Sequence, residues 1–199
     1  MAAYAKAKLE QVLAAICVNS QTLQPVLNLI VDCNQPGAYN GLSAMRTVMD
    51  CILSEDPKID PNTRQSLEAL TANVIHPLTN LACTACMNAL QSYNEENSGL
   101  MLVALELMKT VVAKLPIGPH ISADVLNLMF TIAELGADHQ SVFHQSALSS
   151  MEILTEIMLK KYIPRDNSGS DAQGKTQDRT VHMMMHIVNK TVMLLKSYR

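Results

Sequence analysis

Apolar residues in this chain recur every three to four positions, which is the spacing of one helix face, rather than at every second position as in a strand. The pattern predicts eight helical segments separated by Pro, Gly, Asp and Asn, and therefore an all-α protein. The clearest segment is 100–115, whose broad apolar face consists of Leu100, Val103, Ala104, Leu107, Met108, Val111 and Leu115. In the first segment the apolar residues expected on one side are Leu9, Val12, Leu13, Ile16 and Cys17.

Helix-breaking and helix-capping residues set the expected boundaries. The expected helices are 2–18, a short one ending near 33 with Pro25 in its first turn, 42–54, 61–93, 100–115, 123–135, 142–162 and 180–198. Asp60 is the expected N-cap of the fourth helix, with Pro61 as its first residue. Ser122 is the expected cap of 123–135, and Gly136 follows the end of that helix. Pro77 is expected to kink the 61–93 helix or to split it in two.

Helix pairs recur at about 40-residue spacing, which is within the range of HEAT repeats. The predicted architecture is a single α-solenoid of HEAT-like helix pairs over residues 1–199, and the alternative is a compact helical bundle. The segment 165–179, RDNSGSDAQGKTQDR, has no aliphatic residue larger than Ala172. We therefore expect a mobile loop there, with Ser168 and Ser170 as candidate phosphorylation sites.

Charge and hydropathy argue against nucleic acid and membrane as partners. The net charge is −3, and no stripe of Lys and Arg stands out. No apolar run approaches the roughly 20 residues that span a bilayer. Residues 1–10 lack the apolar stretch of a signal peptide, and the five cysteines lie inside apolar helical patterns. These features predict reduced, buried thiols in the cytosol or nucleus.

Two pairs of residues have the spacing of metal ligands. Cys83 and Cys86 form a CxxC pair, but a zinc site needs two further ligands and a redox site needs a preceding strand, so buried core thiols are favoured. His182 and His186 are four residues apart on one helix face, yet the residues between them are all Met, so a zinc protease's Glu is missing. We predict no metal and no cofactor, because a metal enzyme would require all four residues to converge.

Catalytic patterns of other kinds do not occur in the sequence. There is no Gly-x-Ser-x-Gly elbow, no Gly-rich phosphate loop and no carboxylate cluster on one helix face, so we predict a protein that is not an enzyme. The methionines of the last helix could form either an adaptable binding groove or core packing, and core packing is favoured at helical spacing. These methionines are Met183, Met184, Met185 and Met193.

Several stretches resemble the karyopherin-β family of HEAT-repeat importins and exportins. Residues 7–16, AKLEQVLAAI, resemble the exportin helix that precedes the next repeat. Residues 104–136 are similar to the exportin pattern of a helix, an aromatic-Ile-Pro-Leu-type turn and a helix that opens with Ser or Thr. Residues 146–164, SALSSMEILTEIMLKKYIP, and the helix from Thr180 are similar to the segments that follow in that family.

The resemblance implies a segment of a nuclear transport receptor, an exportin, that shuttles between nucleus and cytoplasm and binds protein cargo, Ran-GTP, or both. No counterpart of the amino-terminal Ran-binding repeats precedes Met1, so it implies an internal piece, a truncated isoform or a domain. A HEAT-type or helical-bundle scaffold subunit of a larger assembly is the alternative. The residues expected to contact a protein partner are Asn127, Glu134, Glu152, Glu156 and Lys160.

Overall fold

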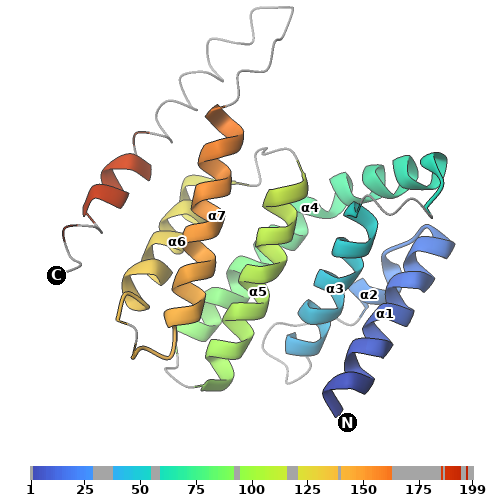
Figure 1. Cartoon of the computed structure of the whole chain (residues 1–199), viewed down its shortest axis with the longest axis horizontal. Helices are drawn as coiled ribbons and strands as arrows, with labels where there is room; N and C mark the ends of the chain where they lie inside the picture. Colours follow the sequence, from blue (N-terminus) through green and yellow to red (C-terminus); the bar gives the residue numbers. More distant parts are fainter. Residues whose placement is uncertain are drawn as a thin grey trace, which may run out of the picture. The chain divides into compact units, whose positions relative to one another are not determined.

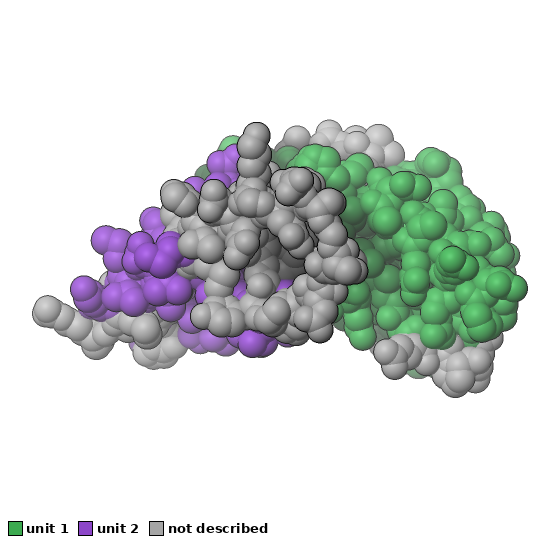
Figure 2. All heavy atoms as spheres, turned by 90° about the horizontal axis from the view of Figure 1, so that it is seen from above, with its two compact units in different colours: residues 1–115 green, residues 116–199 purple. Residues whose placement is uncertain are grey.

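The computed structural model of the chain describes residues 2–28, 38–54, 59–91, 95–115, 121–138, 140–162, 185, 187–193 and 196. These residues form helices and turns without any strand, which confirms the predicted all-α class (Figure 1). The chain divides into two compact units, unit 1 over residues 1–115 and unit 2 over residues 116–199 (Figure 2).

The described residues of unit 1 form five helices in two layers. They are α1 (Ala2–Ser20), α2 (Gln24–Leu27), α3 (Ala38–Leu53), α4 (Pro61–Leu90) and α5 (Glu95–Lys114). α1 packs against α3 and α3 against α5, so these three helices lie side by side in one row (Figure 1). α2 packs against α1 and α3, and α4 packs along α5 and also touches α3. Each helix in the row is therefore covered by helices that precede or follow it in the chain.

Unit 2 is built on one antiparallel helix pair. α6 (Ala123–Leu135) and α7 (His144–Tyr162) pack along each other and are joined by a short connection (Figure 1). Helical residues near the C-terminus, Met185, Ile187–Met193 and Lys196, belong to the same unit and are called the last helix below. The bounds of α6 are the predicted ones. Its Ser122 cap accepts a hydrogen bond from the Val125 N–H at 3.4 Å, as expected.

The apolar side predicted for α1 is largely exposed. Ala14 and Cys17 are buried, but Leu9, Val12 and Ile16 are exposed. The reason is that the side of α1 toward α3 is partly polar. The Glu10 carboxylate accepts hydrogen bonds from the Ser43 hydroxyl at 2.7 Å and the Thr47 hydroxyl at 3.2 Å. The five apolar residues do share one side of α1, as predicted, but only the edge of that side at Cys17 is buried.

The Glu10 carboxylate also has a cationic neighbour. Lys6 Nζ lies 3.7 Å from Glu10 Oε1 and 4.2 Å from the centre of the Tyr39 ring. Lys6 thus joins α1 to α3 by an ion pair within α1 and a cation–π contact across the interface. The α1–α3 interface consequently combines small buried residues with a specific polar cluster.

α4 is one helix with a proline in its interior, which is the kinked alternative of the prediction. Asp60 caps its start and accepts from the N–H groups of Asn62 at 2.9 Å and Thr63 at 3.3 Å. Pro77 cannot donate a hydrogen bond to the preceding turn, and its ring clashes with the carbonyl four residues back. The two halves of α4 accordingly run in different directions in Figure 1.

Several helix boundaries differ from those predicted. α5 begins at Glu95 rather than Leu100, so the polar residues predicted as a loop form its first turn. α3 starts at Ala38, four residues early. α1 continues to Ser20 and ends where Gln21 adopts a left-handed φ of 50°, with the Thr22 N–H bonded to the Cys17 carbonyl. The helices α1, α3 and α5 are thus longer than predicted at one end.

The apolar face predicted for α5 is confirmed. Six of its seven residues are buried, and Leu100 is half-buried. α5 also buries Met101, Leu105 and Val112, so apolar residues surround much of the helix. A helix that is apolar on more than one side is typical of a central element packed by several neighbours, as α5 is by α3 and α4.

Gly136 marks the end of α6, but its role differs from that of a left-handed C-cap. Its φ is −98°, which any residue can adopt. A Cβ at this position would lie 2.4 Å from the Phe143 carbonyl oxygen and 2.5 Å from the Ala147 Cβ. The final carbonyls of α6 are satisfied from the same direction, because His144 Nδ1 lies 3.0 Å from Gly136 O and the Ser141 hydroxyl donates to Leu135 O. Gly136 is therefore required by close approach of the backbone.

Parts of the predicted architecture stay predictions. Each unit is compact by itself. The single solenoid over residues 1–199 stays a prediction. The predicted loop 165–179 lies outside the described residues. So do residues 29–33 of the short second helix, and residues 180–184, 186, 194–195 and 197–198 of the predicted last helix.

We predict that Gly136→Ala destabilises unit 2, because the new Cβ meets backbone atoms that cannot rotate away. The expected loss is about 1–3 kcal/mol of unfolding free energy. Urea denaturation followed by circular dichroism measures it. Gly99→Ala is the matched control, since its Cβ would meet only Tyr39 Cε2, at 3.7 Å. That variant should be neutral or up to about 1 kcal/mol more stable. Equal stability of both variants would contradict this account of Gly136.

Candidate functional site: an apolar pocket in unit 2

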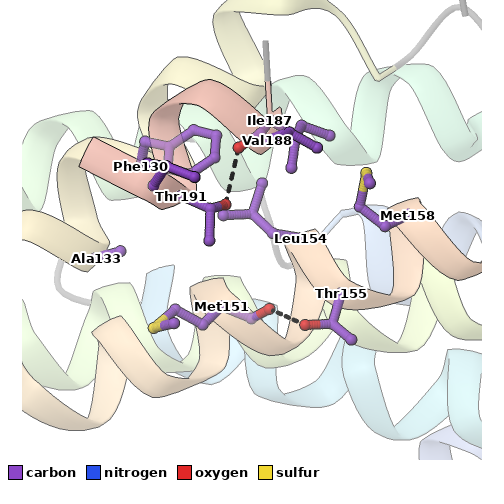
Figure 3. Close-up of a pocket in the computed structure, with 10 residues that line it drawn as sticks. Phe130, Ala133, Met151, Leu154, Thr155, Met158, Ile187, Val188 and Thr191 are labelled. Atoms are coloured by element: carbon purple, nitrogen blue, oxygen red, sulfur yellow. Dashed lines mark hydrogen bonds between the residues drawn. The ribbon is translucent and has the colours of Figure 1, made fainter. Parts of the chain in front are cut away.

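An open apolar pocket of about 330 Å³ lies in unit 2. Its walls come from three elements: α6, α7 and the last helix (Figure 3). The lining residues are Phe130, Ala133, Met151, Leu154, Thr155, Met158, Ile187, Val188, Thr191 and Val192. This volume is at the small end of the range of about 300–1,000 Å³ found for ligand sites. We call this feature the unit 2 pocket.

The unit 2 pocket has a buried floor and an exposed rim. Ile187 is only 4% exposed, and Phe130 and Leu154 are also buried. Figure 3 shows the side chains of Ile187 and Phe130 close to Leu154, so the last helix meets α6 and α7 at this point. At the rim, Val188 and Val192 are each 46% exposed and Met151 is 37% exposed. The pocket can therefore be reached from solvent.

The two polar side chains of the lining are already hydrogen bonded within their own helices. The Thr155 hydroxyl donates to the Met151 carbonyl at 2.8 Å, and the Thr191 hydroxyl donates to the Ile187 carbonyl at 2.8 Å (Figure 3). A hydroxyl that bonds the carbonyl four residues back has its proton committed. The lining consequently presents methyl groups, methylenes, thioethers and one aromatic ring, and it favours an apolar ligand.

Apolar side chains continue beyond the unit 2 pocket along the helices that line it. Leu148 and Leu159 of α7 are exposed, and so are Met185 and Met193 of the last helix. Singly exposed apolar residues are ordinary on a protein surface. Met193 lies on the side of the last helix away from the lining residues Ile187 and Thr191, so it does not extend the pocket.

The five residues predicted to contact a partner lie on the same helix pair, beside the pocket rather than in it. Asn127 and Glu134 are exposed on α6, and Glu152 is exposed on α7. Glu156 and Lys160 of α7 are half-buried. Glu134 follows the lining residue Ala133, and Glu152 follows the lining residue Met151. Whether these side chains bind a partner stays a prediction.

Sequence analysis did not identify the lining residues of the pocket, because their apolar character and helical spacing are those of core residues. Phe130, Leu154 and Ile187 are buried as core residues are, and only their convergence from three helices creates a cavity. The methionines of the last helix were the residues for which sequence analysis had considered a binding groove as well as core packing. Met185 and Met193 are exposed, so the favoured interpretation of these two as core is wrong, and the adaptable binding surface fits them. Met183 and Met184 lie outside the described residues.

The CxxC pair is buried inside α4, as predicted for core thiols. Cys83 and Cys86 are both buried and not bonded to each other. Burial raises the pKa of the Cys83 thiol to about 11 and also raises the pKa of the Cys17 thiol. Reactive cysteines require a lowered pKa, so Cys83 and Cys17 are inert at neutral pH.

A metal site does not form among the described residues, where no three His, Cys, Asp or Glu side chains come together. His182 and His186 lie outside the described residues, and so does the metal site that they would form with Cys83 and Cys86. In the part of the chain that the structure describes, no helix is both long enough and apolar enough to cross a membrane.

Comparisons with known proteins gave no match: no family model, no curated protein and no solved structure is similar to this chain.

We predict that titration of Cys83 makes folding stability depend on pH in the alkaline range. An unfolded thiol has a pKa of about 9, and the folded thiol about 11. The stability contribution of the protonated thiol is therefore fully present below pH 9 and is lost as the pH rises through 11. The loss is about 2–3 kcal/mol. Urea denaturation at several pH values should show Cys83→Ala with a shallower alkaline decline than the unmodified chain. Parallel declines would contradict the assignment.

Proposed function

We propose that this chain is a protein-binding segment of a nuclear transport receptor, an exportin, which recognises protein cargo, Ran-GTP, or both. In this proposal the helices form a HEAT-type solenoid. The sequence resemblance to karyopherin-β proteins suggests this family. The order and spacing of the resembling segments are most similar to those of the exportin that carries profilin and actin. The observation that supports binding is the unit 2 pocket, an accessible surface whose described lining residues are mostly apolar.

The layered packing of unit 1 is consistent with a solenoid. α1, α3 and α5 alternate in the chain with α2 and α4 and lie side by side, each in contact with the next. Solenoids stack consecutive helix pairs so that each contacts only its neighbours. α6 and α7 supply a further antiparallel pair in unit 2. In a solenoid, one helix of each pair faces the concave surface on which protein partners bind.

The first test is a pull-down from nuclear extract with the chain immobilised. Ran loaded with a non-hydrolysable GTP analogue is added to one sample and Ran-GDP to a matched sample. An exportin segment should retain Ran-GTP together with a cargo protein that Ran-GDP does not bring down, because exportins load cargo and Ran-GTP together. Partner capture that is the same in both samples would contradict the transport function and favour a scaffold.

A scaffold subunit of a larger assembly is the second candidate, and the outer side of α1 favours it. Leu9, Val12 and Ile16 share one face of α1, and Leu9 is 70% exposed. A contiguous exposed apolar stripe on a helix at the edge of a unit is typical of an interface with another protein.

If the scaffold proposal holds, Leu9→Gln combined with Ile16→Gln should abolish capture of a Ran-independent partner. The substitutions remove exposed apolar area and leave the buried side of α1 unchanged, so circular dichroism and thermal stability should stay those of the unmodified chain. Met87→Gln provides the control, because Met87 is an exposed apolar residue (49%) elsewhere in unit 1. Retained capture after the α1 substitutions would show that this stripe is not the scaffold interface.

A further inference from the structure

We propose that the exposed side of α4 binds an extended, uncharged segment of a partner polypeptide through the main chain of that segment. The inference rests on the proposed protein-binding function, and it names the surface used and the kind of segment bound. Three features of α4 support it: the absence of charge along its exposed side, the amide groups presented there, and the proline in the middle of the helix.

The exposed side of α4 is one continuous row of residues. Its members lie three or four residues apart, so they share one face of the helix, and all of them are exposed. They are Ser66, Ala69, Asn73, His76, Asn80 and Thr84. We call this set the α4 stripe. At 1.5 Å per residue the α4 stripe is about 27 Å long.

The α4 stripe contains no Asp, Glu, Lys or Arg. None of these four residue types occurs between Glu68 and Glu95, although 17% of the residues in the chain are charged, so the gap is a local feature of this part of the sequence. Glu68 is the one exposed charged residue of α4, and it lies about 140° around the helix from Asn73. The exposed side chains of α4 beyond Glu68 are therefore uncharged.

This composition is that of an interface rather than of an ordinary solvated helix. Exposed helix faces normally carry charged residues, as Lys8 does on α1, Glu134 on α6 and Glu152 on α7. The centres of protein interfaces are instead depleted of Lys, Glu and Asp, because these side chains are costly to remove from water. The α4 stripe thus combines exposure to solvent with the charge depletion expected where a partner binds.

The groups on the α4 stripe form hydrogen bonds in both directions. Asn73 and Asn80 each present an amide that has donor and acceptor groups, as a main-chain peptide unit has. Pro77 adds an acceptor, because it has no N–H to donate to the Asn73 carbonyl, which lacks its usual donor within the helix. Ser66 and Ala69 are small, so another main chain can come close at that end of the stripe.

An extended main chain fits these groups better than a helix does. In a helix the main-chain N–H and C=O groups already bond to one another, so they are not available to Asn73 and Asn80. An extended segment has both groups free, and about eight of its residues would cover 27 Å. Charged side chains on the segment would lose water without meeting an opposite charge, which favours uncharged segments. Nucleic acid is disfavoured for the same reason, since its phosphates require Lys or Arg.

The test is a selection of random peptides of about 12 residues, displayed on phage, against the immobilised full chain. The enriched peptides should contain fewer Asp, Glu, Lys and Arg residues than the starting library. One enriched peptide is then synthesised with a fluorescein label, and its affinity is measured by fluorescence anisotropy. Methylation of its main-chain nitrogens, one at a time, should weaken binding about fivefold to tenfold at the residues that donate to α4, because the methyl group removes the donor.

Asn73→Asp combined with Asn80→Asp should weaken binding of the selected peptide by at least about tenfold, since it removes two amide donors and adds charge to the stripe. Gln140→Glu combined with Gln145→Glu is the matched control. It makes the same change in charge at exposed residues of unit 2 and should leave binding unchanged. Ala69→Arg, which adds a long side chain to the stripe, should also weaken binding, and circular dichroism checks that each variant is folded.

Three results would overturn the proposal. One is a selection that enriches no peptide over beads without the chain, or that enriches charged peptides. Another is unchanged affinity of the selected peptide for the folded Asn73→Asp, Asn80→Asp and Ala69→Arg variants. The third is tolerance of methylation at every main-chain nitrogen, which would assign binding to side chains. Ran-dependent capture of cargo is measured separately, so its persistence after any of these results would leave the transport function in place and exclude only this use of α4.

Discussion

The contact between Gly136 and the first turn of α7 determines how close α6 and α7 can lie. A side chain at this position would overlap the Phe143 carbonyl and the Ala147 methyl group, so the pair approaches as closely as backbone allows. Ser141 and His144 hold the last carbonyls of α6 at the same place. Because the pair is fixed at this end, Phe130 of α6 and Leu154 of α7 are held in the relative positions that the last helix meets. The unit 2 pocket lies between this helix pair and the last helix.

Polar and apolar groups are distributed so that unit 2 offers contact area and little reactivity. The hydroxyls at the pocket are bonded to their own helices, and among the described residues no set of metal-binding side chains gathers. In unit 1 the buried Cys83 thiol is held in its protonated form by desolvation. These properties are the ones that a binding surface shares with the rest of the described protein: apolar contact area at the pocket and a protonated thiol in the core.

The sequence predicted local structure well where a single residue type decides it, and less well where distant segments meet. The bounds of α6 follow from the Ser122 cap and from Gly136, and the cap of α4 follows from Asp60 and Pro61. The start of α5 at Glu95 was not predicted, since the polar residues before Leu100 and the glycine at 99 are typical of a loop. The pocket was missed because its lining comes from α6, α7 and the last helix, and each residue alone resembles core. Helix periodicity identified exposed polar neighbours such as Glu134 but not the cavity beside them.

The Glu10 cluster has a consequence for the outer side of α1. Two hydroxyls of α3 converge on one carboxylate, so α1 has one favoured register along α3, and a shift by one turn would break both hydrogen bonds between the helices. The orientation of α1 is therefore set by directional bonds on its inner side and does not depend on whether Leu9, Val12 and Ile16 are covered. A protein that packs on this outer side would meet a surface already ordered, and it would lose less conformational entropy on binding than one that must first arrange a mobile helix.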